Sequence, residues 1–402
     1  MRLTLRGNPT GVCLLGLGLL AGMSAAEAAP KIYNLTDLGG LGSNYAEALA
    51  INDNGTIVGA ARDTNGNTLA TLFDGAGGNF NQSLGTLLGG DSSRANDINN
   101  NGLIVGRSDN AAGQRRAVVF GNFVVDLGTF GGPESEAYAV NNSGVIVGEA
   151  DTTDITNTLD NVPNAARFFA NGSAPSNISP LSVTPTSSVA YGLSDNGTAV
   201  GDRPVNARAV RFTTSGIPVL TELGGIGNSF SQAFGANANG DIVGETFPGG
   251  VIHATLFDSS GGGANIDLSG AAGEFGQFSS SARSINDVGE IVGTAVVSPG
   301  GAFDDIRAAY FDTVDDMVYD LNTLVDPNDP DFGTLRLIAA RDINNKGQIV
   351  GWASVVGQNN FLTAFLLTPV VEAEEEMDMP EPATWLLLGA ALVGFASWRR
   401  RI

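Results

Sequence analysis

Acidic side chains have the widest chemical repertoire in this sequence. The chain has 402 residues, of which 42 are Asp or Glu. Four of these acids follow a repeated Val-Gly step at similar distances, namely Glu149, Asp151, Asp202 and Glu245. Because paired carboxylates can cleave glycosidic bonds, one interpretation is a glycosidase or lyase that uses acids on one face of the fold. With so many acids in the chain, a solvated acidic rim is the other interpretation.

Nucleophilic catalysis and zinc binding lack their usual residues. A catalytic triad needs a base such as His, and the sole histidine, His253, occupies a repeated position that elsewhere holds Arg, Ala or Thr. We interpret it as an outer-strand side chain. The sole cysteine, Cys13, lies in the N-terminal apolar segment. The sequence therefore predicts no catalytic residue, no cofactor and no zinc site.

Calcium is the one ion for which oxygen donors recur. Turns rich in Asn and Asp occur at residues 52–55, 99–102, 195–197 and 286–289. None of them has the alternating acidic spacing of an EF-hand loop. Turn formation explains them without an ion, so calcium is kept only as an alternative.

A ligand face is the remaining candidate site. Aromatic or arginine side chains recur three residues before a repeated Asn or Ser, at Tyr138, Tyr191, Phe234, Arg283 and Arg341. Such side chains suit a glycan or a peptide. Packing between repeated units is the alternative.

These positions belong to a unit that is repeated seven times. It consists of Ala, two variable residues, an apolar residue, Asn or Ser, a polar turn with Gly, and a closing Val-Gly. The copies lie at residues 48–59, 95–106, 137–148, 190–201, 233–244, 282–293 and 340–351. A unit that returns every several tens of residues indicates one stacked supersecondary structure.

Each unit predicts four short strands. The first two flank the Asn/Asp-Gly turn, which is a hairpin signal. The third carries an Ala-x-x-Phe step and the fourth a Leu-Gly-x-Leu-Gly-Gly step or a weaker version. Four strands in about forty to fifty residues are typical of a propeller blade, with the first strand innermost. We expect an all-β fold, a seven-bladed propeller of four-stranded antiparallel blades.

The two ends of the repeat region predict how the ring closes. Residues 32–40 form a fourth-strand segment with no unit before it, and the last unit stops after its third strand, near Leu367. The N-terminal strand can therefore complete the last blade and leave no long free edge.

Both chain termini have the character of targeting signals. Residues 1–28 read as a signal peptide, with Arg2 and Arg6, an apolar run and a cleavage site after Ala28. Residues 31–368 hold the repeats, and residues 369–379 form an acidic linker. Residues 380–402 contain a Pro-Glu-Pro step, an apolar run and a terminal arginine cluster. A plain C-terminal membrane anchor is the alternative for this last segment.

Two resemblances follow from these segments. Pro380, Glu381, Pro382 and the arginines Arg399, Arg400 and Arg401 resemble the PEP-CTERM sorting signal, which implies processing by an exosortase-type protease. The units resemble the HAF repeats of extracellular bacterial proteins, with His253-Ala254, Arg116-Ala117 and Thr363-Ala364-Phe365 at the step that gives the family its name. This resemblance implies export but no reaction.

The net charge of the chain limits the classes of molecule that it can bind. The formal net charge is -22, which argues against a nucleic acid partner. We therefore expect a non-enzymatic binding or structural protein at the surface of a Gram-negative cell, with polysaccharide or other matrix components as partners. Its C-terminal helix would hold it briefly in the inner membrane. A carbohydrate-active enzyme is the alternative.

Overall fold

The structure of this protein is a computed structural model. It describes residues 31–77, 80–153, 162–178, 187–203, 207–216, 218–269, 272–273, 279–297, 306–358 and 360–370. These residues are strands and turns, apart from two single-turn 3-10 segments, η1 (Ile226–Asn228) and η2 (Pro248–Gly250). The all-β prediction is confirmed.

The predicted leader, at residues 1–28, and the sorting segment, at residues 380–402, lie outside the described residues. In the part of the chain that the structure describes, no helix has the length and apolar character to cross a membrane.

The strands form antiparallel sets of four, in which each strand pairs with the next along the chain. The first two sets are β2 (Gly42–Ile51), β3 (Ile57–Asp63), β4 (Thr68–Phe73), β5 (Gln82–Gly85), and β6 (Ser93–Ile98), β7 (Ile104–Asp109), β8 (Arg115–Phe120), β9 (Val125–Asp126). The next two are β10 (Gly131–Val140), β11 (Ile146–Thr152), β12 (Val162–Phe168), β13 (Ser176–Asn177), and β14 (Val189–Leu193), β15 (Thr198–Arg203), β16 (Arg208–Thr213), β17 (Leu220–Glu222). A fifth set is β18 (Ser231–Ala236), β19 (Ile242–Thr246), β20 (His253–Phe257), β21 (Ile266–Asp267).

The remaining strands depart slightly from this plan. One sheet contains β23 (Ser280–Ile285), β24 (Ile291–Val296), β25 (Ile306–Asp312) and β26 (Met317–Asp320), and a fifth strand, β22 (Ala272–Gly273), joins it in parallel. The last strands are β27 (Leu335–Ile343), β28 (Ile349–Val355) and β29 (Leu362–Pro369). A single parallel bridge from Tyr45 to Leu362 links β29 to β2.

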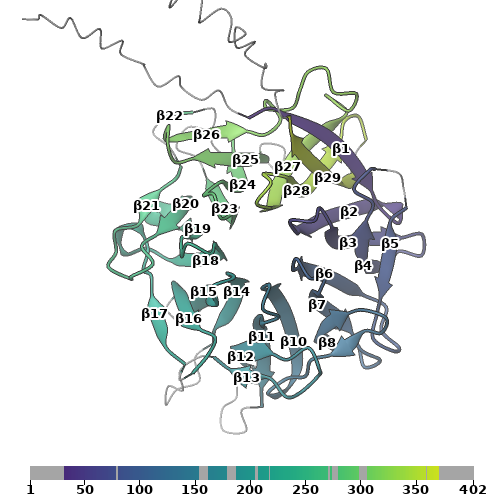
Figure 1. The fold of residues 1–402 in the computed structure, drawn as a ribbon, viewed down its shortest axis with the longest axis vertical. Helices are drawn as coiled ribbons and strands as arrows, with labels where there is room; N and C mark the ends of the chain where they lie inside the picture. The colour runs from purple at the N-terminus through teal and green to yellow at the C-terminus, as the bar shows by residue number, and fades with distance from the viewer. Residues whose placement is uncertain are drawn as a thin grey trace, which may run out of the picture. The chain divides into compact units, whose positions relative to one another are not determined.

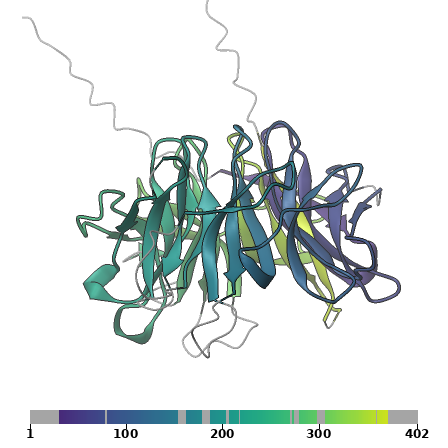
Figure 2. The same ribbon diagram turned by 90° about the horizontal axis from the view of Figure 1, so that it is seen from below.

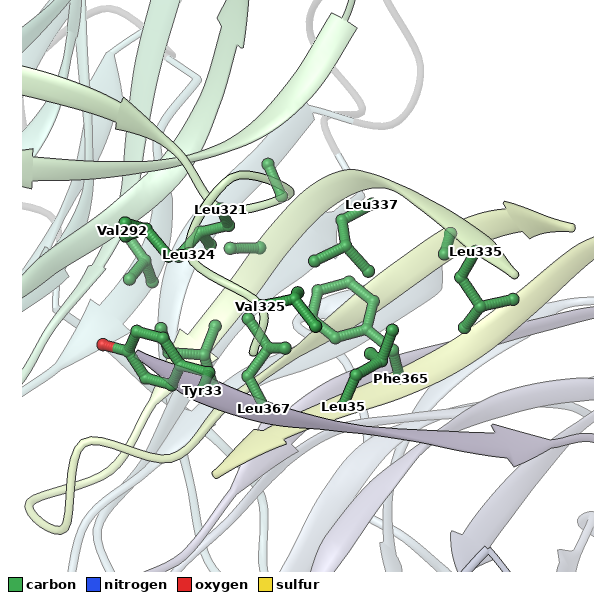
Figure 3. Close-up of a cluster of buried hydrophobic side chains, with 14 of the residues drawn as sticks. Tyr33, Leu35, Val292, Leu321, Leu324, Val325, Leu335, Leu337, Phe365 and Leu367 are labelled. Carbon is green, nitrogen blue, oxygen red and sulfur yellow. The ribbon is translucent and has the colours of Figure 1, made fainter. Parts of the chain in front are cut away.

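The N-terminal strand pairs with the end of the last repeat, as the sequence predicts. β1 (Tyr33–Gly39) runs antiparallel to β29, from Tyr33 opposite Pro369 to Gly39 opposite Ala364. Tyr33 and Leu35 point into a buried cluster that includes Phe365 and Leu367 of β29 (Figure 3). The first described strand therefore completes a four-stranded set with β27, β28 and β29.

The core lies between neighbouring sheets. Successive sheets share buried apolar clusters, and one such cluster joins Ala48 and Ile57 of the first sheet to Leu38, Val350 and Leu366 of the last. Figure 1 shows the sheets following one another around a centre, with the first strand of each set innermost. Figure 2 shows that the strands run roughly along the direction of view of Figure 1.

A one-residue register shift recurs between the first and second strands of every repeat, as in a β-bulge. In the third repeat, Ala137 pairs with Gly148 and Ala139 pairs with Val147, so Tyr138 is the additional residue. The shift brings the two backbones very close at the glycine. A Cβ on Gly148 would lie 2.0 Å from the carbonyl oxygen of Glu136. This contact explains why each unit closes on Val-Gly.

Two of the fourth strands begin where the leucine pattern begins, β17 at Leu220 and β21 at Ile266, but others are displaced from it. β26, for example, ends at Asp320, before the predicted segment 321–324, which forms a turn. The leucine after the fourth strand still hydrogen bonds to the third strand through its backbone. The N–H of Leu127, for example, donates to the carbonyl of Ala117 at 2.8 Å. Positive φ at Gly128, 83°, then turns the chain out of the sheet.

The repeated Asn residues connect the sheets. Asn52 accepts hydrogen bonds from the N–H groups of Asn54 and Thr56 in its own turn, as predicted. Its Nδ2 also donates to the carbonyl of Asn99 in the next sheet, at 3.0 Å. The same donation recurs from sheet to sheet at 99→141, 141→194, 237→286 and 286→344, and Asn344 returns to the carbonyl of Asn52 at 3.0 Å. The step after Ser194 lacks it, because serine has no amide.

Candidate functional site

A central cavity of about 660 Å³ lies among the first strands and their turns. Its lining comes from every repeat, including Asn52, Asn99, Asn141, Asn237 and Asn344. The volume falls in the range of about 300–1,000 Å³ that is usual for small-molecule sites. It is therefore large enough for a ligand rather than for water alone.

All five residues of the predicted ligand face line this cavity. Tyr138, Tyr191, Phe234, Arg283 and Arg341 are the additional residues at the register shifts of successive repeats. Leu49 and Asn96 hold the same position in the first two repeats and also line the cavity. We call these seven side chains the bulge layer. A bulge re-aims a side chain, which explains how one repeated position comes to face the centre.

The aromatic members of the bulge layer touch one another across sheet boundaries. The ring centroids of Tyr138 and Tyr191 are 5.4 Å apart, and those of Tyr191 and Phe234 are 5.7 Å apart. The guanidinium of Arg283 lies 4.1 Å from the centre of the Phe234 ring. Four consecutive repeats thus contribute planar groups that contact one another, with the aromatic rings tilted by 60° and 53°. Such contacts add to apolar burial and hold the rings in place.

The two arginines of the bulge layer are paired differently. Arg283 lies 3.6 Å from the Glu245 carboxylate. Arg341 lies 5.1 Å from the centre of the Trp352 ring, and the described residues offer it no ion pair. Burial lowers the pKa of Arg341 to about 10, and the nearby charges of Arg283 and Arg94 act in the same direction. Arg341 therefore stays protonated at neutral pH, and the Glu47 carboxylate acts against the effect of the two arginines.

A second group of charges lies beside the bulge layer. Arg115 contacts Glu136 at 3.2 Å and Glu149 at 3.3 Å, and Arg107 contacts Glu136 at 3.5 Å. Glu136 and Glu149 are directly opposite each other on β10 and β11. The hydroxyl of Tyr138 donates to Glu149 at 3.1 Å. This cluster ties the orientation of Tyr138 to a network of arginines and carboxylates.

Two aspartates join neighbouring sheets near the cavity wall. Asp97 accepts a hydrogen bond from the N–H of Val140 at 2.7 Å, and Asp342 accepts one from the N–H of Ile51 at 2.9 Å. Burial raises the pKa of Asp97 to about 8, and the charge of Asp342 adds to the shift. Burial also raises the pKa of Asp342.

The acids that suggested glycoside cleavage do not converge in the cavity. Glu149, Asp151, Asp202 and Glu245 are absent from the cavity lining. Asp202 accepts a hydrogen bond from Gln232 Nε2 at 2.6 Å, and burial raises its pKa. Burial raises the pKa of Glu149 and of Asp151 as well. Three of these acids are thus partners of side chains that do line the cavity, through Arg115, Gln232 and Arg283.

The Asn- and Asp-rich turns use their oxygens within the fold. Asp53 accepts from the N–H of Asn345 at 2.9 Å and from Asn100 Nδ2 at 2.8 Å. Among the described residues, no group of three or more His, Cys, Asp or Glu side chains has the geometry to hold a metal ion. Calcium at these turns stays a prediction, and so does the lack of a cofactor.

Sequence reasoning missed the arginines of the cavity wall, Arg94, Arg107 and Arg115. Arg94 pairs with Glu47, and each residue directly precedes the Ala of its repeat, as Glu136 does. The charge at that position alternates through the first three repeats, at Glu47, Arg94 and Glu136, and this alternation was visible in the sequence.

The predicted sorting and cleavage residues lie outside the described residues. They are Pro380, Glu381, Pro382, Arg399, Arg400, Arg401 and Ala28.

Comparison with known proteins identifies the C-terminal segment. Residues 380–401 match the PEP-CTERM protein-sorting motif. This motif implies a bacterial protein that is exported and sorted by an exosortase. Residues 13–121 match a family described as a protein of unknown function (DUF3466).

No curated protein matches the chain. A solved structure titled "Crystal structure of puromycin hydrolase" is similar over 80% of this chain, with 16% sequence identity and a TM-score of 0.35. The match spans 58% of the length of that structure.

Proposed function

We propose that residues 31–368 form a closed seven-bladed β-propeller of HAF repeats that binds polysaccharide at the outside of the cell without altering it chemically. Three features support closure of the ring. β1 completes the last set of strands, a buried cluster joins the first and last sheets, and Asn344 donates to the carbonyl of Asn52. A linear stack of sheets would leave its first and last members apart.

Export is the part of this proposal with support from the sorting motif at residues 380–401. We infer that residues 1–28 direct secretion, that the acidic linker at 369–379 separates the propeller from the tail, and that an exosortase-type protease acts near Pro380, Glu381 and Pro382. The cell would be Gram-negative, and the apolar tail would anchor the protein in its inner membrane until processing.

The single observation that carries the binding proposal is the bulge layer in the central cavity. Tyr138, Tyr191 and Phe234 present aromatic rings that contact one another from three consecutive sheets. Aromatic faces bury the apolar side of a sugar ring, while Asn and Arg side chains around them can hydrogen bond to its hydroxyl groups. Most of the other lining side chains are polar, which suits a ligand rich in hydroxyl groups.

A glycan and polysaccharide binding screen on the purified full chain tests this proposal. We expect at least one extracellular polysaccharide to bind, and Tyr191→Ala to weaken that binding about tenfold or more. Phe123→Ala is the matched control, because Phe123 is an aromatic residue that is 84% exposed and lies outside the cavity lining. Equal loss in both variants, or no binding to any glycan, would contradict the proposal.

A carbohydrate-active enzyme is the second candidate, and one observation favours it. Glu136 lines the cavity, directly opposite the buried Glu149 on the next strand, and burial raises the pKa of Glu149. Two neighbouring carboxyl groups, one of which is buried and has a raised pKa, are the arrangement from which an acid and base pair can be built. Release of reducing ends from a bound polysaccharide, abolished by Glu136→Gln, would favour this candidate over simple binding.

A further inference from the structure

The cavity combines its aromatic wall with five arginines, against six Asp and Glu side chains in the same lining, so it is richer in arginine than the chain as a whole. The chain as a whole has 20 Lys and Arg against 42 Asp and Glu, yet five arginines line this one cavity. Four of them have a carboxylate partner: Arg94 with Glu47, Arg107 and Arg115 with Glu136, and Arg283 with Glu245. Arg341 is the exception among the described residues.

The surroundings of Arg341 make its charge costly. Its guanidinium rests beside Trp352 and is repelled by Arg283 and Arg94, and the Glu47 carboxylate, which already pairs with Arg94, offsets only part of this effect. The neighbouring acid in sequence, Asp342, does not compensate, because its two oxygens accept hydrogen bonds from the N–H of Ile51 and from Ser284 Oγ. A part-buried cation without a partner is unfavourable, and such sites are characteristic of function rather than of stability. An anionic ligand would supply the missing partner.

The position of this cation relative to the aromatic wall defines the ligand. Arg341 and Arg283 occupy the same layer in adjacent repeats, and Arg283 stacks on Phe234, which in turn contacts Tyr191. A ring lying on the aromatic groups would therefore have its substituents near a pair of guanidinium groups. A guanidinium binds a carboxylate through two parallel hydrogen bonds, which a hydroxyl group cannot match.

We propose that the cavity selects acidic sugars, with Arg341 binding the carboxylate of a uronic acid unit and Tyr191 and Phe234 packing against its ring. This inference rests on the proposed glycan binding and names the class of glycan. Neutral polysaccharides would fill the same aromatic wall but leave Arg341 without a counter-ion.

Pairs of ligands that differ only in charge distinguish the contribution of the carboxylate to binding from that of the sugar ring. Isothermal titration of the full chain would use oligogalacturonides, alginate fragments and hyaluronan fragments, each also as its methyl ester. The ester keeps the ring and the linkage but removes the charge. We expect the best acidic oligomer to bind about tenfold or more tightly than its ester, and this difference to shrink as salt is raised from about 50 to about 300 mM.

Variants then assign the effect to one residue. Arg341→Gln should lose about tenfold in affinity for the acidic oligomer and change the affinity for the ester by less than about twofold. Arg62→Gln is the control, because Arg62 also stacks on an aromatic ring, that of Tyr45, but lies outside the cavity lining. Arg341→Lys, which keeps the charge, should retain part of the preference even where Arg341→Gln does not fold.

The outcomes distinguish the selection of acidic sugars from glycan binding itself. Equal binding of acid and ester would overturn the selection of acidic sugars and leave glycan binding standing. Loss of both ligands in folded Arg341→Gln would show a structural role for Arg341 and would likewise overturn the selection. No binding to any acidic or neutral glycan would overturn glycan binding itself.

Discussion

The glycine that ends each repeat gives the sharpest test of the register shift. Gly148 faces the backbone of β10, and a Cβ there would lie 2.0 Å from the carbonyl oxygen of Glu136, whereas side-chain carbons essentially never approach closer than 3.0 Å. Gly148→Ala therefore requires the two strands to separate by about 1 Å. The obstacle is backbone, so no rotamer change relieves it.

The expected cost follows from overpacking. Inserting a methyl group into a packed core costs about 1–3 kcal/mol, and a collision with backbone places this variant near the upper end, at about 3 kcal/mol. Gly121→Ala is the matched control. The nearest atom to a Cβ on Gly121 is the carbonyl oxygen of Phe123 at 3.8 Å, so this variant should change the stability by less than about 1 kcal/mol.

Urea denaturation of both variants measures the difference as a shift in midpoint at constant slope. A large loss of stability for Gly148→Ala and almost none for Gly121→Ala is the expected result. Equal stability of the two variants would refute the close approach of β10 and β11, and with it the reason why Tyr138 is turned toward the cavity.

Three further predictions follow from the same structure. Ser194→Asn should stabilise the protein by about 1 kcal/mol, because the new amide can donate to the carbonyl of Asn237 and fill the gap in the circle of side-chain bonds; no gain in the denaturation midpoint would contradict this. Leu35→Ala should cost about 2–5 kcal/mol because Leu35 is 4% exposed in β1, whereas Val219→Ala, at a position 54% exposed, should cost less than about 1 kcal/mol. Asp97 has a pKa raised to about 8, so the folded state holds a proton that the unfolded state loses above about pH 4. Stability should therefore fall as the pH rises from about 4 to 8, and Asp97→Asn should flatten that slope whatever its constant cost; an unchanged slope would show that Asp97 is ionised in the folded protein.

The sequence was sufficient for the repeating plan of the fold. Asn-Gly turns, alternating strands and the Ala-x-x-Phe step are local signals, and they placed the hairpins and third strands where the structure has them. The unmatched segment at residues 32–40 also predicted the pairing of β1 with β29, because a repeat that is split between the two termini leaves one part at each end. Two fourth strands begin where the leucine pattern begins, at Leu220 and Ile266, but the one before Gly128 was placed too late, because positive φ at that glycine ends pairing earlier than the pattern indicates.

The sequence also identified the candidate site by position. Tyr138, Tyr191, Phe234, Arg283 and Arg341 stand at one place in the repeat, and equivalent places in equivalent sheets face the same centre. Whether they would form a ligand face or pack between units could not be read from the sequence, because that depends on the extra residue at the register shift. The shift arises from two strands approaching at a glycine, which only their pairing reveals.

Tertiary structure alone decided the charges around that site. The sequence determined that the chain is an acidic, exported array of repeats, because composition, periodicity and the sorting motif are properties of local order. It did not determine that Glu47 pairs with Arg94, that Arg115 joins Glu136 to Glu149, or that Arg341 lies over Trp352 without an ion pair among the described residues. These relations connect residues of different sheets, and the Coulomb interaction depends on a distance in space that sequence separation does not encode.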